Sequence, residues 1–145
     1  MKISYLKAIH QIIHYGHFIT HRVSQELKEF DISEPQFNVL RILKGSRGKA
    51  LNLQDISAKM VQKNSNVTRI VNKLVDRNLV IQQQCPTNRR KVEITITPEG
   101  KTFLKKLEVK VENIHHPFNK NLNTNELENL NVLLHKLFKQ YETKH

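Results

Sequence analysis

The stretch NSNVTRIVNKLVDRNLV, from Asn64 to Val80, has the apolar spacing of a short helix with one buried face. We predict this helix over Asn64 to Arg77, with Asn64 as its N-cap, because the asparagine side chain can accept a free amide of the first turn. The apolar stripe consists of Val67, Ile70, Val71 and Leu74. The opposite face carries side chains that suit base edges and phosphates, namely Ser65, Asn66, Thr68, Arg69, Asn72 and Lys73. The alternative is an ordinary amphipathic helix with a solvated polar face, and the neighbouring segments decide between the two.

Two further helices are predicted before this stretch, each starting with a capping box. Ser33 can pair with Gln36, and Asn52 can pair with Asp55. A short turn over Val61 to Lys63 then leads into the opening stretch. Two short helices joined by such a turn match the helix-turn-helix pattern, in which the second helix enters the major groove of DNA.

A β-hairpin is predicted directly after the helix-turn-helix. Leu79 to Gln84 reads as extended, and Val92 to Ile96 alternates between apolar and polar residues, which is typical of a strand with one buried face. The turn between them has a basic tip, and arginine at a protruding tip suits a narrow minor groove. We expect DNA contacts from Asn88, Arg89, Arg90 and Lys91 at this tip, and from Lys63 in the preceding turn. The alternative is a solvated hairpin turn, but a hairpin that follows a helix-turn-helix favours the DNA-binding interpretation.

Long helices are predicted at both ends of the chain. One covers residues 3–29, a second begins at Thr97-Pro98-Glu99, and a last one is capped by Thr124. Their apolar stripes have little core to bury against in a chain of 145 residues, so we expect them to pack against a second copy. The predicted fold is mainly α with a small β-hairpin, in a single domain over 1–145. A winged helix-turn-helix over 33–97 is flanked by dimerisation helices over 1–32 and 98–145.

The charge of the chain favours an anionic partner. The formal net charge is +11, from 24 Lys and Arg against 13 Asp and Glu. Between Lys59 and Thr97 the sequence has eight of these cations and only two acids. The single cysteine, Cys85, excludes an internal disulfide framework and fits a reducing compartment. The sequence has no apolar run long enough for a membrane span and no signal-peptide pattern, so we expect a cytoplasmic protein.

Three runs of the sequence resemble the MarR family of bacterial winged-helix regulators. Gln36 to Leu40 resembles the family's second-helix core, and Asn66 to Val71 resembles its recognition helix. Asn88 through Gly100 resembles its wing and the start of the following helix. The similarity covers essentially the whole chain. One departure is Asn88, where the family usually has an aspartate that braces a wing arginine by an ion pair, so we expect weaker bracing here.

The resemblance implies a homodimer that binds a pseudo-palindromic operator in double-stranded DNA and represses transcription. It also implies release by a small anionic or aromatic effector, held between the first helix and the winged domain. The candidates for that cleft are Tyr5, His14, His17 and Phe18. The alternative role for these four residues is packing in the core or at the dimer interface, and we favour this alternative.

Two other signals lead to no separate function. His10, His14, His17 and His21 share one helix face, and imidazoles one turn apart can bind zinc or sense pH. A single straight helix cannot surround an ion, so we expect a solvated or dimer-facing stripe and no metal or cofactor. Cys85 has no second cysteine to pair with, so we expect it to be inert.

We also expect no catalysis, because the sequence has no glycine-rich phosphate loop and no nucleophile motif. The runner-up function is a basic architectural or RNA-binding protein without a sequence-specific operator. Only sequence-specific binding should survive an excess of random DNA, which distinguishes the two.

Overall fold

The computed structural model describes residues 2–63 and 66–142 of the protein. In these ranges the elements are α1 (Lys2–Lys28), α2 (Glu34–Gly45), α3 (Leu53–Lys59), α4 (Val67–Asp76), β1 (Val80–Gln84), β2 (Val92–Ile96), α5 (Pro98–His115), the 3-10 helix η1 (His116–Lys120) and α6 (Thr124–Glu142). The prediction of a mainly helical fold with a small hairpin is confirmed. The chain divides into two compact units, Met1–Val111 and Glu112–His145, which we describe separately.

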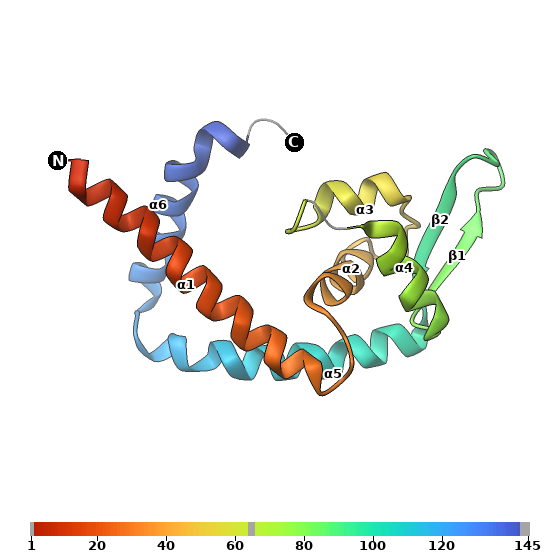
Figure 1. Ribbon diagram of the computed structural model, residues 1–145, viewed down its shortest axis with the longest axis horizontal. Coiled ribbons are helices and arrows are strands. Elements are labelled where there is room, and N and C mark those ends of the chain that lie inside the picture. Colours follow the sequence, from red (N-terminus) through yellow and green to blue (C-terminus); the bar gives the residue numbers. More distant parts are fainter. Residues whose placement is uncertain (1, 64–65, 143–145) are drawn as a thin grey trace. The chain divides into compact units, whose positions relative to one another are not determined.

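The core of the first unit lies among α2, α3, α4, the hairpin, α5 and the C-terminal end of α1. In Figure 1, α2, α3 and α4 are gathered beside the hairpin, and the C-terminal end of α1 lies beside α5. Fully buried side chains come from every one of these elements, and the largest include Leu27, Leu40, Leu43, Ile56, Leu74, Ile94, Leu104 and Leu107. This core holds the helix-turn-helix and the base of the hairpin as one body.

Local hydrogen bonds define the starts of α2 and α3, as predicted. The Ser33 hydroxyl accepts the Gln36 amide at 3.3 Å, and the Gln36 side chain accepts the Ser33 amide at 2.9 Å. The Asn52 side chain accepts the Asp55 amide at 2.8 Å, and the Asp55 carboxylate accepts the Asn52 amide at 3.1 Å. Both capping boxes therefore form, and each satisfies two otherwise free amides.

The hairpin is anchored at its base to α5. β1 and β2 pair antiparallel from Val80 opposite Ile96 to Gln84 opposite Val92. The Thr97 hydroxyl donates to the Asn78 carbonyl at 2.7 Å and accepts the Gly100 amide at 2.9 Å, which caps α5 at the predicted start. A Cβ at Gly100 would lie 2.1 Å from the Leu79 carbonyl oxygen, so this close approach requires glycine.

The second unit contains the end of α5, η1 and α6. The helix α6 begins at Thr124, and its N-cap is the preceding residue, Asn123. The Asn123 side chain accepts the Glu126 amide at 2.8 Å, and the Glu126 carboxylate accepts the Asn123 amide at 2.9 Å. The prediction of Thr124 as the cap is therefore wrong, because the asparagine one residue earlier forms the capping box. Across the described residues, no helix is both long and apolar enough to span a membrane.

Candidate nucleic-acid interface

The helix α4 presents one polar face and buries the other. Val67, Val71 and Leu74 are buried, and Ile70 is half-buried. The residues predicted to contact DNA from this helix and its cap are all exposed, namely Asn66, Thr68, Arg69, Asn72 and Lys73, and Asp76 at the end of the helix is exposed as well. Their amide, hydroxyl and guanidinium groups can form hydrogen bonds with base edges, while the lysine can pair with a phosphate.

The N-cap of α4 differs from the prediction. The Asn66 side-chain oxygen accepts the Arg69 amide at 3.1 Å, and the helix begins at Val67. The predicted cap Asn64 and the predicted contact Ser65 lie outside the described residues. The prediction of a helix that starts at Asn64 is therefore wrong, since Asn66 occupies the non-helical cap position. The cap engages only the oxygen of Asn66, and its amide nitrogen still offers two donors at the end of the helix that would approach DNA.

The connection between α3 and α4 is longer than the predicted turn over Val61 to Lys63, because α3 ends at Lys59 and α4 starts only at Val67. Two contacts hold its first part. The Val61 amide donates to the Asn38 side-chain oxygen of α2 at 2.9 Å, and the Lys63 ammonium donates to the Ala58 carbonyl at 2.5 Å. Asn38 is a positioning residue that the sequence pattern did not reveal, because its partner is 23 residues away.

The hairpin tip is closed by hydrogen bonds within the turn. The Cys85 amide donates to the Lys91 carbonyl at 2.9 Å, and the Lys91 amide donates to the Asn88 carbonyl at 3.0 Å. The Asn88 side-chain oxygen accepts the backbone amide of Arg90 at 3.1 Å. Asn88 thus supports the turn through the backbone of an arginine. An uncharged amide can accept this bond as an aspartate would.

The cations of this surface are not neutralised by acids. Arg69, Lys73, Arg89, Arg90 and Lys91 are all exposed. The ion pairs found within residues 2–63 and 66–142 are Lys44–Glu108, Lys110–Glu29 and His135–Glu142, none of which involves α4 or the hairpin. The α4 face and the hairpin tip therefore form a surface of uncompensated positive charge, which suits a phosphate backbone.

A hollow of about 240 Å³ lies where the hairpin approaches the start of α3. The N-cap Asn52 lines it together with Leu53 and Gln54 of α3, and Arg90, Lys91 and Val92 line it from the hairpin. Two of the predicted DNA contacts therefore share a surface with the first helix of the helix-turn-helix.

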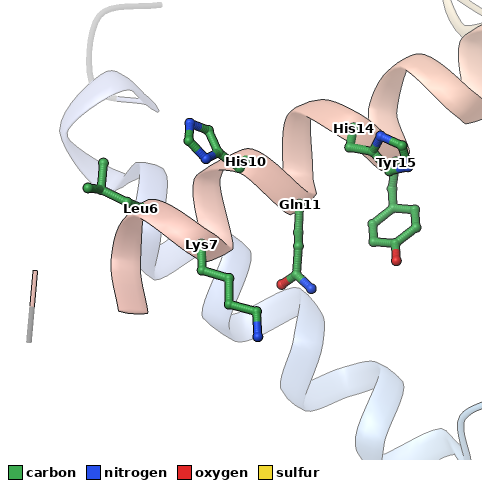
Figure 2. A pocket seen from close by; sticks show the side chains of 6 residues that line it. All are labelled: Leu6, Lys7, His10, Gln11, His14 and Tyr15. Carbon is green, nitrogen blue, oxygen red and sulfur yellow. The ribbon is translucent and has the colours of Figure 1, made fainter. Parts of the chain in front are cut away.

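The four residues predicted for an effector cleft are not gathered at one place by α1. Tyr5, His14, His17 and Phe18 are all exposed on this helix. At 1.5 Å per residue, Tyr5 and Phe18 lie about 20 Å apart along a straight helix. A hollow of about 480 Å³ beside α1 includes His14, and its lining consists of Leu6, Lys7, His10, Gln11, His14 and Tyr15 (Figure 2).

The other two features noted in the sequence are the histidine stripe of α1 and the single cysteine, Cys85. His10, His14, His17 and His21 are exposed, and the described residues contain no group of three or more His, Cys, Asp or Glu arranged to hold a metal ion. Cys85 is half-buried, with its sulfur 3.3 Å from the Thr87 hydroxyl.

A helix-turn-helix with a polar, cationic second helix, followed by a hairpin with a basic tip, defines the winged helix-turn-helix class of DNA-binding proteins. The sequence profile of the MarR family matches residues 32–92. This segment, which contains the helix-turn-helix and most of the hairpin, therefore resembles the MarR family in sequence.

Individual MarR-type proteins are similar over most of their length. The transcriptional regulator TcaR of Staphylococcus aureus is 26% identical over 133 residues, which cover 90% of this chain and 86% of TcaR. The transcriptional repressor IacR of Pseudomonas putida is 26% identical over 124 residues, or 86% of this chain and 73% of IacR. The crystal structure of a mutant MarR from E. coli in complex with operator DNA has a TM-score of 0.76 at 21% identity, covering 92% of this chain and 95% of that one. These similarities do not favour the alternative of an architectural or RNA-binding protein.

Proposed function

We propose that the protein is a homodimeric repressor that binds a pseudo-palindromic operator through α4 and the hairpin. The observation that carries this proposal is the exposed polar face of α4, whose cations, like those of the hairpin tip, have no acidic partner among the described residues. The operator complex of the E. coli relative and the name of the IacR repressor support it. Because its target is DNA, we place the protein in the cytoplasm, and we ascribe no catalytic activity to it.

The roles of the surface residues follow from their chemistry. Asn66, Thr68 and Arg69 lie at the start of α4, the end that enters the major groove in helix-turn-helix proteins. We assign base reading to these three residues. We assign phosphate contacts to Lys63 and to the cation farther along α4, Lys73. Asn64, Ser65 and Asn72 complete the proposed groove contacts, and Asn88, Arg89, Arg90 and Lys91 form the proposed wing contact.

Exposed apolar side chains on the terminal helices support the proposed dimer. On α1, Tyr5, Ile13 and Phe18 are each at least half exposed. The helix α6 exposes a longer series, with Leu127, Leu130, Val132, Leu133, Leu137, Phe138 and Tyr141. Apolar surface of this extent is rarely left open to water, and a second copy that covers it would form a large apolar interface.

The test is a selection of bound sites from random DNA duplexes, followed by competition with random DNA. We expect a symmetric site with two half-sites about one helical turn, roughly 34–36 Å, apart. Binding to that site should survive an excess of random duplex. Sedimentation at micromolar concentration should give the mass of a dimer. Selected sequences that share no common site would contradict the proposed operator binding. A monomeric mass would contradict the proposed dimer.

We extend the proposal to release of the operator by a small anionic or aromatic effector. The hollow beside α1 supports this extension, since Lys7, His10 and His14 offer donors for an anion and Tyr15 lies next to His14 with its ring centroid 5.1 Å away. A panel of aromatic carboxylates added to the preformed complex would test it. A compound that releases wild-type protein should act more weakly on His14→Ala, and an equal effect would place the binding site elsewhere.

A further inference from the structure

Arg77, the residue directly after α4, does not belong to the basic DNA-facing surface. Its guanidinium donates to the Asp31 carbonyl at 2.7 Å and to the Phe30 carbonyl at 3.1 Å. The same group lies 5.1 Å from the ring centroid of Phe103 in α5. The rings of Phe30 and Phe103 meet edge to face at 6.2 Å. One side chain therefore joins the end of α4 to the turn after α1 and to α5.

The partners of Arg77 are well suited to a cation. Phe30 and Asp31 belong to the turn that ends α1, where the Asp31 amide bonds the Lys28 carbonyl and the Ile32 amide bonds the Leu27 carbonyl. The carbonyl end of a helix carries partial negative charge, which attracts a positive group. A guanidinium can donate to two carbonyls and stack on an aromatic ring at the same time. A lysine ammonium can replace its charge but not this geometry.

Arg77 acts where the packing between α1 and α4 is interrupted. A hollow of about 610 Å³ separates the two helix ends, lined by Ser24 and Lys28 of α1, by Lys73 and Asp76 of α4, and by Arg77 itself. The bonds of Arg77 connect the C-terminal end of α4 directly to the turn after α1 at the edge of this hollow.

We propose that Arg77 is a positioning residue that fixes the angle of α4 relative to α1 and α5, and thereby the spacing of half-sites that the dimer accepts. This inference rests on the proposed function, in which α1 and the closing helices join the two protomers. The orientation of each α4 within its protomer then sets the separation of the two groove-reading helices. A change of one base pair moves a half-site by about 3.4 Å, so a fixed α4 should reject it.

The test compares wild type, Arg77→Lys and Arg77→Ala on the selected operator and on versions with one base pair added or removed between the half-sites. We expect both variants to lose about tenfold of the preference for the original spacing, as the loss of a charge-assisted bond would allow. The salt dependence of binding should stay as in wild type, because Arg77 does not touch phosphate. Lys73→Ala is the matched control from the same helix, and it should keep the spacing preference but lower the salt slope by about 0.9.

Two outcomes would overturn the inference. If Arg77→Ala lowered the salt slope as Lys73→Ala does, Arg77 would be a phosphate contact. If both Arg77 variants unfolded at lower temperature but kept the spacing preference, Arg77 would serve stability alone.

A measurement without DNA separates this inference from the proposed function. Spin labels on cysteines placed at Ser24 and Asn72, in a Cys85→Ser background, report the distance between α1 and α4. We expect a wider distance distribution in Arg77→Lys than in wild type, even if the selection had revealed no operator. An unchanged distribution would refute the positioning role.

Discussion

Replacing Gly100 by alanine should test whether the base of the hairpin depends on its close approach to α5. The new Cβ would lie 2.1 Å from the Leu79 carbonyl oxygen and 2.8 Å from Cγ1 of Ile96. The first of these neighbours is backbone and cannot turn away. Either β1 or the start of α5 must therefore move.

The structure allows an estimate of the cost. Overpacking of this kind costs about 1–3 kcal/mol, and a forced shift of backbone lies at the upper end. The Leu79 carbonyl also accepts the Thr97 amide at 3.1 Å, and losing that bond adds about 0.5–1.5 kcal/mol. The helix propensity of alanine returns at most about 1 kcal/mol. We expect a net loss of about 2–4 kcal/mol.

Urea unfolding followed by circular dichroism, at one fixed protein concentration, measures this loss. The midpoint should fall while the slope of free energy against urea stays the same. Gly45→Ala is the matched control, because a Cβ there meets nothing within 4 Å. It should leave the protein as stable as wild type or more so. If Gly100→Ala and Gly45→Ala unfolded at the same urea concentration, the close approach at Leu79 would not be a constraint.

Three further predictions concern the DNA surface and one carboxyl group. Arg69→Ala should weaken operator binding by about 1–3 kcal/mol while random-DNA binding stays nearly constant, and an equal loss on both in binding titrations would make Arg69 a backbone contact. Replacing Arg89 and Arg90 together by alanine should flatten base preference only at the outer positions of the selected site, where a narrow minor groove favours arginine. A selected profile that lost its centre would contradict that division of roles. Burial raises the pKa of the Glu34 carboxyl group, because burial disfavours its charged form. The free energy of unfolding is therefore higher at a pH below the ordinary carboxyl pKa, and this gain is lost as the pH rises through the raised pKa. In pH-dependent unfolding, Glu34→Gln should abolish that decline, and a curve parallel to wild type would count against it.

Local signals in the sequence were sufficient for most of the elements. The capping boxes at Ser33 and Asn52 were predictable because all their partners lie within three residues. The same logic was ambiguous at α4 and α6, where neighbouring residues of capping type compete and the chain geometry selects one. The sequence pattern therefore predicted caps at Asn64 and Thr124, whereas Asn66 and Asn123 form them.

The long-range contacts could not be predicted from the sequence. Asn38 supports the turn before α4 through an amide 23 residues away, and Arg77 bonds carbonyls 46 and 47 residues away. Their partners are backbone amide and carbonyl groups, so the contact does not depend on the type of the partner residue. Arg77 is one of the eight cations between Lys59 and Thr97, but the charge count could not show that its contacts turn it toward α1 and α5. The face of α4 was predictable because its buried stripe is local.

The uncompensated cations of α4 and the hairpin also have a kinetic consequence. A chromosome offers a vast excess of weak, sequence-independent sites to such a surface, and counterion release makes each of them attractive. Most molecules would therefore rest on the chromosome and move along it by sliding and hopping, with few diffusing freely. The time needed to reoccupy a vacated operator would then depend on the length of these excursions, and a rise in cellular salt would shorten each of them.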